Sequence, residues 1–147
     1  MTEVKNLTAA EREFLEKQAY HYFMEKGFSC GLTMLHCLSD LFKLPLDSQV
    51  YDAMNGVLEN RDYRDQCGLY KGALMFIGIY GTSLGWGRPQ INEATMDFAQ
   101  KMEKDFGSLK CYDLRGGKFQ PTEPHDKCAP LAARGVVYAA DYMRALK

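Results

Sequence analysis

The chain has 147 residues, of which 46% are hydrophobic and 25% charged, which predicts one globular domain rather than a disordered, collagen-like or coiled-coil protein. Eighteen basic and nineteen acidic side chains leave a formal net charge of −1, which disfavours nucleic-acid binding through a basic surface. The longest apolar run, residues 73–80, is far shorter than the roughly 20 residues that a bilayer span needs, so no membrane span is expected. The N-terminal residues contain no apolar segment of signal-peptide length, which makes the cytoplasm the expected compartment.

Local signals predict two helices in the first 45 residues. Thr8 and Glu11 match a capping box that starts the first helix, and Gly27 is placed to end it. Ser29 is the expected N-cap of the second helix, which Pro45 stops. The apolar positions of the first helix are Phe14, Leu15, Ala19, Tyr22 and Phe23.

Four more helices are predicted in the rest of the chain. Asp47 or Ser48 caps the third, and the fourth covers residues 67–84. The fifth covers residues 92–107, and the last covers residues 126–146. Runs of strand-like alternation are scarce. We therefore expect an all-α fold of six helices in one domain over residues 1–147, with the fourth helix central because it is apolar nearly all round.

The predicted fourth helix is unusually rich in glycine. Each glycine inside a helix costs roughly 0.8–1 kcal/mol relative to alanine, so a compensating contact is expected. Gly68 and Gly72 lie on one face, where another backbone or a cofactor can approach closely. Helix–helix packing is the commoner use of such a face, and a homodimer contact is a further one.

Five cysteines are more than a reduced protein core requires, and they favour metal binding or redox chemistry over a disulfide framework. Cys30, Cys67 and Cys128 fall at predicted helix N-termini, where the peptide dipoles favour a thiolate. Cys111 falls in the loop after the fifth helix. Cys37 lies inside the second helix and is expected to be an inert core residue.

Two other uses of these cysteines are less well supported by local spacing. Structural zinc sites show cysteine pairs two to four residues apart, and this chain has none, although separate helices can still assemble such a site. A cysteine hydrolase would have His125, three residues before Cys128, as its base, but no oxyanion element is recognisable. Covalent c-type haem is excluded because no Cys-x-x-Cys-His is present.

The order of these residues resembles the C_GCAxxG_C_C family of redox-active proteins over about residues 20–145. The resemblance rests on Gly27-Phe28-Ser29-Cys30, Cys67-Gly68-x-x-x-Gly72-Ala73, Phe106-Gly107-Ser108-x-x-Cys111 and the Cys128 that opens the last helix. It implies a helical redox domain with Cys30, Cys67, Cys111 and Cys128 as the cofactor or metal ligands, Gly68 and Gly72 as the motif glycines, and an iron–sulfur centre in some relatives. The chain departs from the family at Leu69, which replaces an alanine, and at residues 60–66, where a charged segment replaces a glycine-rich one.

Two hypotheses of different classes follow. In the first, the four cysteines converge on one site that either binds an iron–sulfur cluster of the [2Fe–2S] type for electron transfer or carries out thiol–disulfide exchange through Cys30 and Cys67. Either chemistry requires a redox partner protein. In the second hypothesis, the chain is a non-catalytic helical binding module whose cysteines are core residues or structural zinc ligands.

Overall fold

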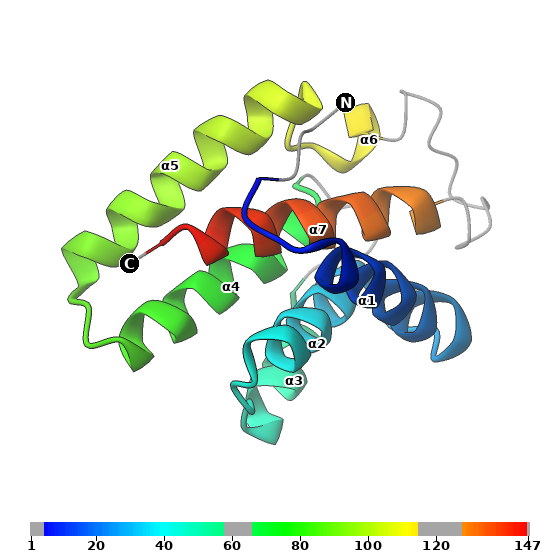
Figure 1. Cartoon of the computed structure of the whole chain (residues 1–147), viewed down its shortest axis with the longest axis horizontal. Coiled ribbons are helices and arrows are strands. Elements are labelled where there is room, and N and C mark those ends of the chain that lie inside the picture. Colours follow the sequence, from blue (N-terminus) through cyan, green and yellow to red (C-terminus); the bar gives the residue numbers. More distant parts are fainter. Residues whose placement is uncertain (1–4, 58–65, 115–127, 147) are drawn as a thin grey trace.

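The computed structural model describes residues 5–57, 66–114 and 128–146 (Figure 1). All the regular structure of these residues is helical, which confirms the all-α class, and each of the six predicted helices is present. Two short elements were not predicted: the π-helical turn η1 and the four-residue helix α6. The elements are α1 (Ala9–Tyr20), η1 (His21–Glu25), α2 (Cys30–Phe42), α3 (Ser48–Met54), α4 (Gly68–Ser83), α5 (Arg88–Phe106), α6 (Cys111–Leu114) and α7 (Ala129–Arg144).

The predicted caps of the first two helices are confirmed. The Thr8 hydroxyl accepts the Glu11 backbone N–H at 3.0 Å, and the Glu11 carboxylate accepts the Thr8 backbone N–H at 3.0 Å, which completes the capping box. The Ser29 hydroxyl accepts the Leu32 backbone N–H at 3.3 Å at the start of α2. Gly27 has a φ of +68° and supplies the left-handed residue between η1 and α2.

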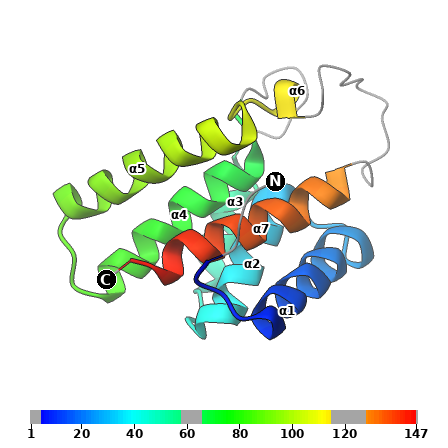
Figure 2. The ribbon, with the colours of Figure 1, turned by 45° about the horizontal axis from the view of Figure 1, so that its top comes forward.

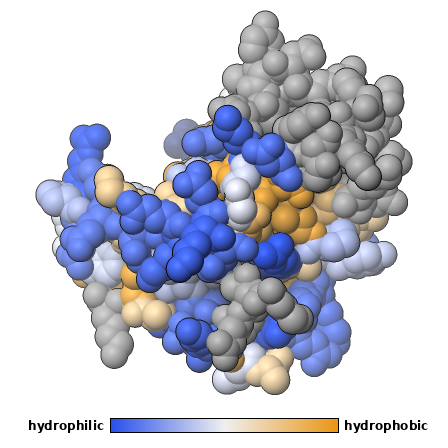
Figure 3. All heavy atoms as spheres, turned by 90° about the horizontal axis from the view of Figure 1, so that it is seen from above, coloured by the Kyte–Doolittle hydropathy of each residue, from blue (hydrophilic) through white to orange (hydrophobic). Residues whose placement is uncertain are grey.

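Helix α4 occupies the centre of the molecule, as its composition predicts. It packs against α2, α5 and α7, while α1 covers α7 and α2 (Figures 1 and 2). Phe76 and Ile77 of α4 are fully buried in one continuous core, which also takes in residues from the other long helices. Seen from above, the surface is mainly hydrophilic with an apolar area in its middle (Figure 3).

Two predicted details are wrong. Helix α5 begins at Arg88 rather than Asn92, because Gly87 serves as the N-cap and Pro89 fits the first turn, where its missing N–H is not needed. Phe14, assigned to the buried stripe of the first helix, is 41% exposed, because the buried face of α1 is narrower and centres on Leu15 and Ala19.

No helix within the described ranges is both long enough and apolar enough to cross a lipid bilayer.

Candidate functional site

The backbone around Cys67 ties the start of α4 to the segment that leads into α6. The Cys67 N–H donates to the carbonyl oxygen of Leu109 at 2.8 Å, and Gln66 forms an isolated antiparallel bridge with Lys110. Cys67 is the N-cap of α4 and is 2% exposed. Because Lys110 immediately precedes Cys111, this tie brings two cysteines that are distant in sequence to neighbouring positions.

Cys111 and Cys128 both lie within electrostatic reach of Cys67. Burial raises the pKa of the Cys67 thiol to about 11, since a thiolate there would lose its hydration. The first-turn N–H groups of Leu69 and Tyr70 oppose this by favouring the thiolate, whereas negative charge on Cys111 or Cys128 raises the pKa further. Sulfurs from the starts of α4, α6 and α7 therefore form one coupled group, which we call the cysteine site.

The remaining cysteine positions agree with the helix-terminus pattern and extend it. Cys128 is the N-cap of α7, with Pro130 in the first turn, and Cys30 is the first residue of α2. Cys111 was expected in a loop but is the first residue of α6, because the Lys110 carbonyl already accepts the Leu114 N–H at 3.0 Å. None of the five cysteines forms a disulfide bond, and the side chains of Cys30, Cys111 and Cys128 are half-buried.

Close helix packing brings the start of α2 to α4. A Cβ added at Gly72 would lie 2.9 Å from the Gly31 carbonyl oxygen and 3.0 Å from the Met34 Cβ. Gly72 follows Cys67 by five residues, or about 7.5 Å along the helix axis. Cys30 therefore enters the fold beside the first turns of α4, and the face of Gly72 that was considered for a cofactor is filled by α2.

Helix α7 packs against the same end of α4, which begins with the other motif glycine, Gly68. Gly68 is buried as the first residue of α4. A Cβ added at Gly135 of α7 would lie 3.0 Å from Cδ1 of Leu69, so α7 lies close against this part of α4. The leucine that departs from the family alanine thus fills the space between α4 and α7.

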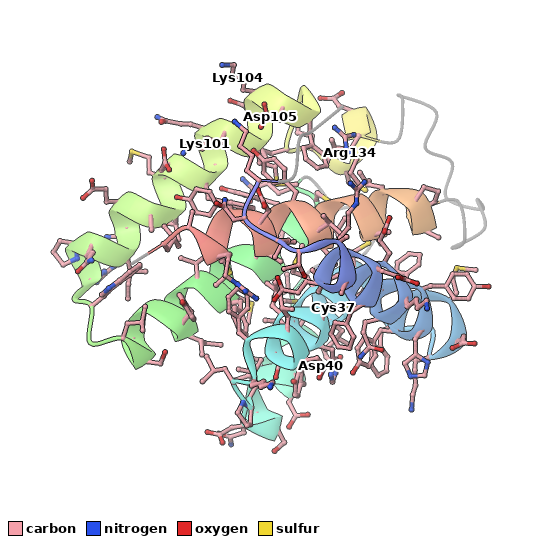
Figure 4. All side chains as sticks on the ribbon, viewed as in Figure 1. Cys37, Asp40, Lys101, Lys104, Asp105 and Arg134 are labelled. Atoms are coloured by element: carbon pink, nitrogen blue, oxygen red, sulfur yellow. The ribbon has the colours of Figure 1, made fainter. Side chains whose placement is uncertain are left out.

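Cys37 stands apart from the cysteine site, as predicted. It is fully buried within α2, and burial followed by the nearby Asp40 carboxylate raises the pKa of its thiol well above the ordinary value (Figure 4). Asp40 is engaged in its own contacts, accepting the Tyr22 hydroxyl at 2.6 Å and the Gln18 amide at 2.8 Å. Cys37 is therefore a core residue whose sulfur stays protonated.

A preformed metal site is not found in the part of the chain that the structure describes. Within it, no three or more His, Cys, Asp or Glu side chains are placed to hold a metal ion. A [2Fe–2S] cluster needs four sulfurs around one compact centre. His125 and residues 60–65 lie outside the described residues.

The sequence does not predict the side-chain hydrogen bonds that join α5 to α7. The Tyr138 hydroxyl donates to the Asp105 carboxylate at 2.6 Å, and the Tyr142 hydroxyl donates to the Asp97 carboxylate at 2.8 Å. Figure 4 shows Asp105 on α5, across from α7. No local pattern in the sequence pairs a tyrosine with an acid 33 or 45 residues away.

Comparison with known proteins agrees with the cysteine pattern. A family model described as "Putative redox-active protein (C_GCAxxG_C_C)" matches residues 28–142, which include all four cysteines at helix starts as well as Gly68 and Gly72. No curated protein and no solved structure matches the chain. Because the family model covers most of the sequence, the chain belongs to the C_GCAxxG_C_C family of redox-active proteins.

Proposed function

We propose that the chain is a thiol–disulfide redox protein in which Cys30 is the attacking thiol and Cys67 the resolving thiol. The observation that carries this proposal is the close packing of α2 on α4, where a Cβ added at Gly72 would lie 2.9 Å from the Gly31 carbonyl oxygen, so that Cys30 stands beside the helix that begins at Cys67. Disulfide chemistry within one chain requires two cysteines whose backbones lie close enough for their sulfurs to bond.

The difference in burial between Cys30 and Cys67 supports the two proposed roles. Cys67, with a pKa of about 11 and almost no exposure, is protonated at neutral pH and is a poor first attacker. Cys30 is half-buried in the first turn of the 13-residue helix α2, where the peptide dipoles favour negative charge on its sulfur. Negative charge on Cys111 or Cys128 would raise the pKa of Cys67 further, which favours Cys67 as the resolving thiol.

The exchange takes place in two steps. The Cys30 thiolate attacks one sulfur of a disulfide in the partner, a mixed disulfide forms, and the partner's other sulfur leaves as a thiolate that takes a proton from water. Cys67 then gives its proton to water and attacks the Cys30 sulfur, so that the Cys30–Cys67 disulfide forms and the second partner sulfur leaves. Two electrons pass from the chain to the partner, whose disulfide is reduced to two thiols.

Trapping the intermediate tests this assignment. Reduced wild-type chain mixed with oxidised glutathione is expected to form the Cys30–Cys67 disulfide, while Cys67→Ser should stop at a stable glutathione adduct on Cys30, read by peptide mass spectrometry. Cys30→Ser should react much more slowly than the wild type. Cys37→Ala is the matched control and should exchange like the wild type. An adduct that forms equally fast in Cys30→Ser would contradict the role of Cys30.

An iron–sulfur cluster is the second candidate, favoured by one observation. Negative charges on Cys111 and Cys128 disfavour a third charge on Cys67, and a bound cation relieves that repulsion. Chain purified without oxygen should then contain iron and absorb visible light, and serine at any of the four cysteines should abolish both. Colourless, iron-free chain that exchanges with glutathione excludes the cluster. Chain that does neither supports the non-catalytic binding module.

A further inference from the structure

Thr33 carries a buried hydroxyl group for which the structure shows no hydrogen-bond partner. The residue is 0% exposed, and among the buried side-chain nitrogen and oxygen atoms of the described residues its Oγ1 alone has no hydrogen-bond partner. A hydroxyl inside a helix commonly bonds the carbonyl four residues earlier, but here the Ser29 carbonyl oxygen accepts the Thr33 backbone N–H at 2.9 Å and not the Thr33 hydroxyl. Leaving such a group unpaired costs about 1–3 kcal/mol, so a use for it is expected.

Two sulfurs share the helix face of Thr33. Cys30 lies three residues before it and Cys37 four residues after it, spacings that place side chains on neighbouring turns of one face. The Cα–Cβ bonds of a helix tilt toward its N-terminus, which brings Thr33 Cβ nearer the turn of Cys30 than that of Cys37, and the Thr33 hydroxyl bonds neither sulfur in this structure. Cys37 stays protonated, whereas Cys30 stands in the first turn, where negative charge is favoured.

We propose that Thr33 donates a hydrogen bond to the Cys30 sulfur when that sulfur is negatively charged, and so makes the chain a stronger oxidant once its disulfide has formed. Hydrogen bonds to a charged acceptor are roughly twice as strong as neutral ones, so the reduced form gains more from this contact than the disulfide form. Stabilising the reduced form raises the reduction potential. The inference rests on the proposed function and adds a residue that regulates it.

The isosteric variant Thr33→Val removes the donor and keeps the shape. Its equilibrium with glutathione is expected to shift about tenfold toward the disulfide, which corresponds to a potential about 30 mV lower. Alkylation of Cys30 by iodoacetamide at pH 8 should slow about threefold, because the thiolate fraction falls while the remaining thiolate becomes a better nucleophile. Thr33→Ser keeps the hydroxyl and should restore both values.

The control variant is Thr82→Val in α4, whose hydroxyl already donates to the Gly78 carbonyl oxygen at 2.8 Å on an exposed surface. It should change neither the potential nor the alkylation rate. Urea unfolding of Thr33→Val in a Cys30→Ala background, where no Cys30 thiolate can form, should show stability equal to or greater than that of Cys30→Ala alone, since an unpaired hydroxyl has been removed. Wild-type behaviour of Thr33→Val in both thiol measurements would overturn the inference. If the wild-type chain forms no disulfide at all, the proposed function fails, and the alkylation rate still decides the role of Thr33.

Discussion

Replacing Gly72 with alanine tests the close packing that brings α2 to the start of α4. The new methyl carbon would lie 2.9 Å from the Gly31 carbonyl oxygen and 3.0 Å from the Met34 Cβ, and a backbone atom cannot move aside without moving its helix. Overpacking of this kind costs about 1–3 kcal/mol. Alanine also gains up to about 1 kcal/mol of helix propensity over glycine, which offsets part of that cost.

Gly78 in the same helix provides the matched control. An added Cβ there meets no atom within 4 Å, so Gly78→Ala should be more stable than the wild type by about 1 kcal/mol. Both variants gain the same helix propensity, so the difference between their free energies of unfolding reports the steric cost alone, about 1–3 kcal/mol. Urea unfolding followed by circular dichroism measures this difference. Equal stability of the two variants would refute the packing argument, because it would mean that α2 does not press against Gly72.

Three further predictions concern caps, pH and the α5–α7 contact. Thr8→Ala should lower the free energy of unfolding by about 1 kcal/mol, measured in urea, because it removes the capping box of α1. Because the pKa of Cys67 is raised in the folded chain, its protonated thiol contributes to the free energy of unfolding. That contribution is fully present below the ordinary thiol pKa of 9.0 and is lost as the pH rises toward about 11. The wild type should therefore lose more stability than Cys67→Ala between pH 8 and pH 11, and parallel losses would argue against a buried thiol. Tyr142→Phe should raise the pKa of Asp97, because the hydrogen bond from the tyrosine hydroxyl lowers that pKa, and it should lower the free energy of unfolding by about 1 kcal/mol. An NMR titration that finds the same Asp97 pKa in the variant and the wild type would contradict this.

Features of the fold that depend on neighbouring residues could be predicted from the sequence. The capping box of Thr8 and the N-cap Ser29 act within one helical turn, so their residue types are sufficient evidence. The π-helical turn η1 was not predicted, because it differs from an α-helix by one residue per turn and carries no composition of its own. The exposure of Phe14 was not predicted, because the spacing of apolar residues indicates which face of a helix is buried but not how wide that buried face is.

The site was only partly predictable for a related reason. Placing Cys30, Cys67 and Cys128 at helix starts required local signals alone. Cys67 lies near Cys111 because the Cys67 N–H donates to the Leu109 carbonyl oxygen, and the spacing of residues along the sequence does not reveal this long-range hydrogen bond. The family resemblance grouped the four cysteines, and the fold supplies the physical connection for three of them.

The bond between Cys67 and Leu109 uses main-chain atoms only, and the flanking Gln66 and Lys110 are both exposed. Evolution can therefore exchange the side chains at these flanking positions widely and still keep the two chain segments joined. A homologue that had lost every recognisable residue there could retain the same architecture around its sulfurs. Engineers who wish to alter the charge near the thiols can accordingly begin at positions 66 and 110, where new side chains leave the underlying join intact.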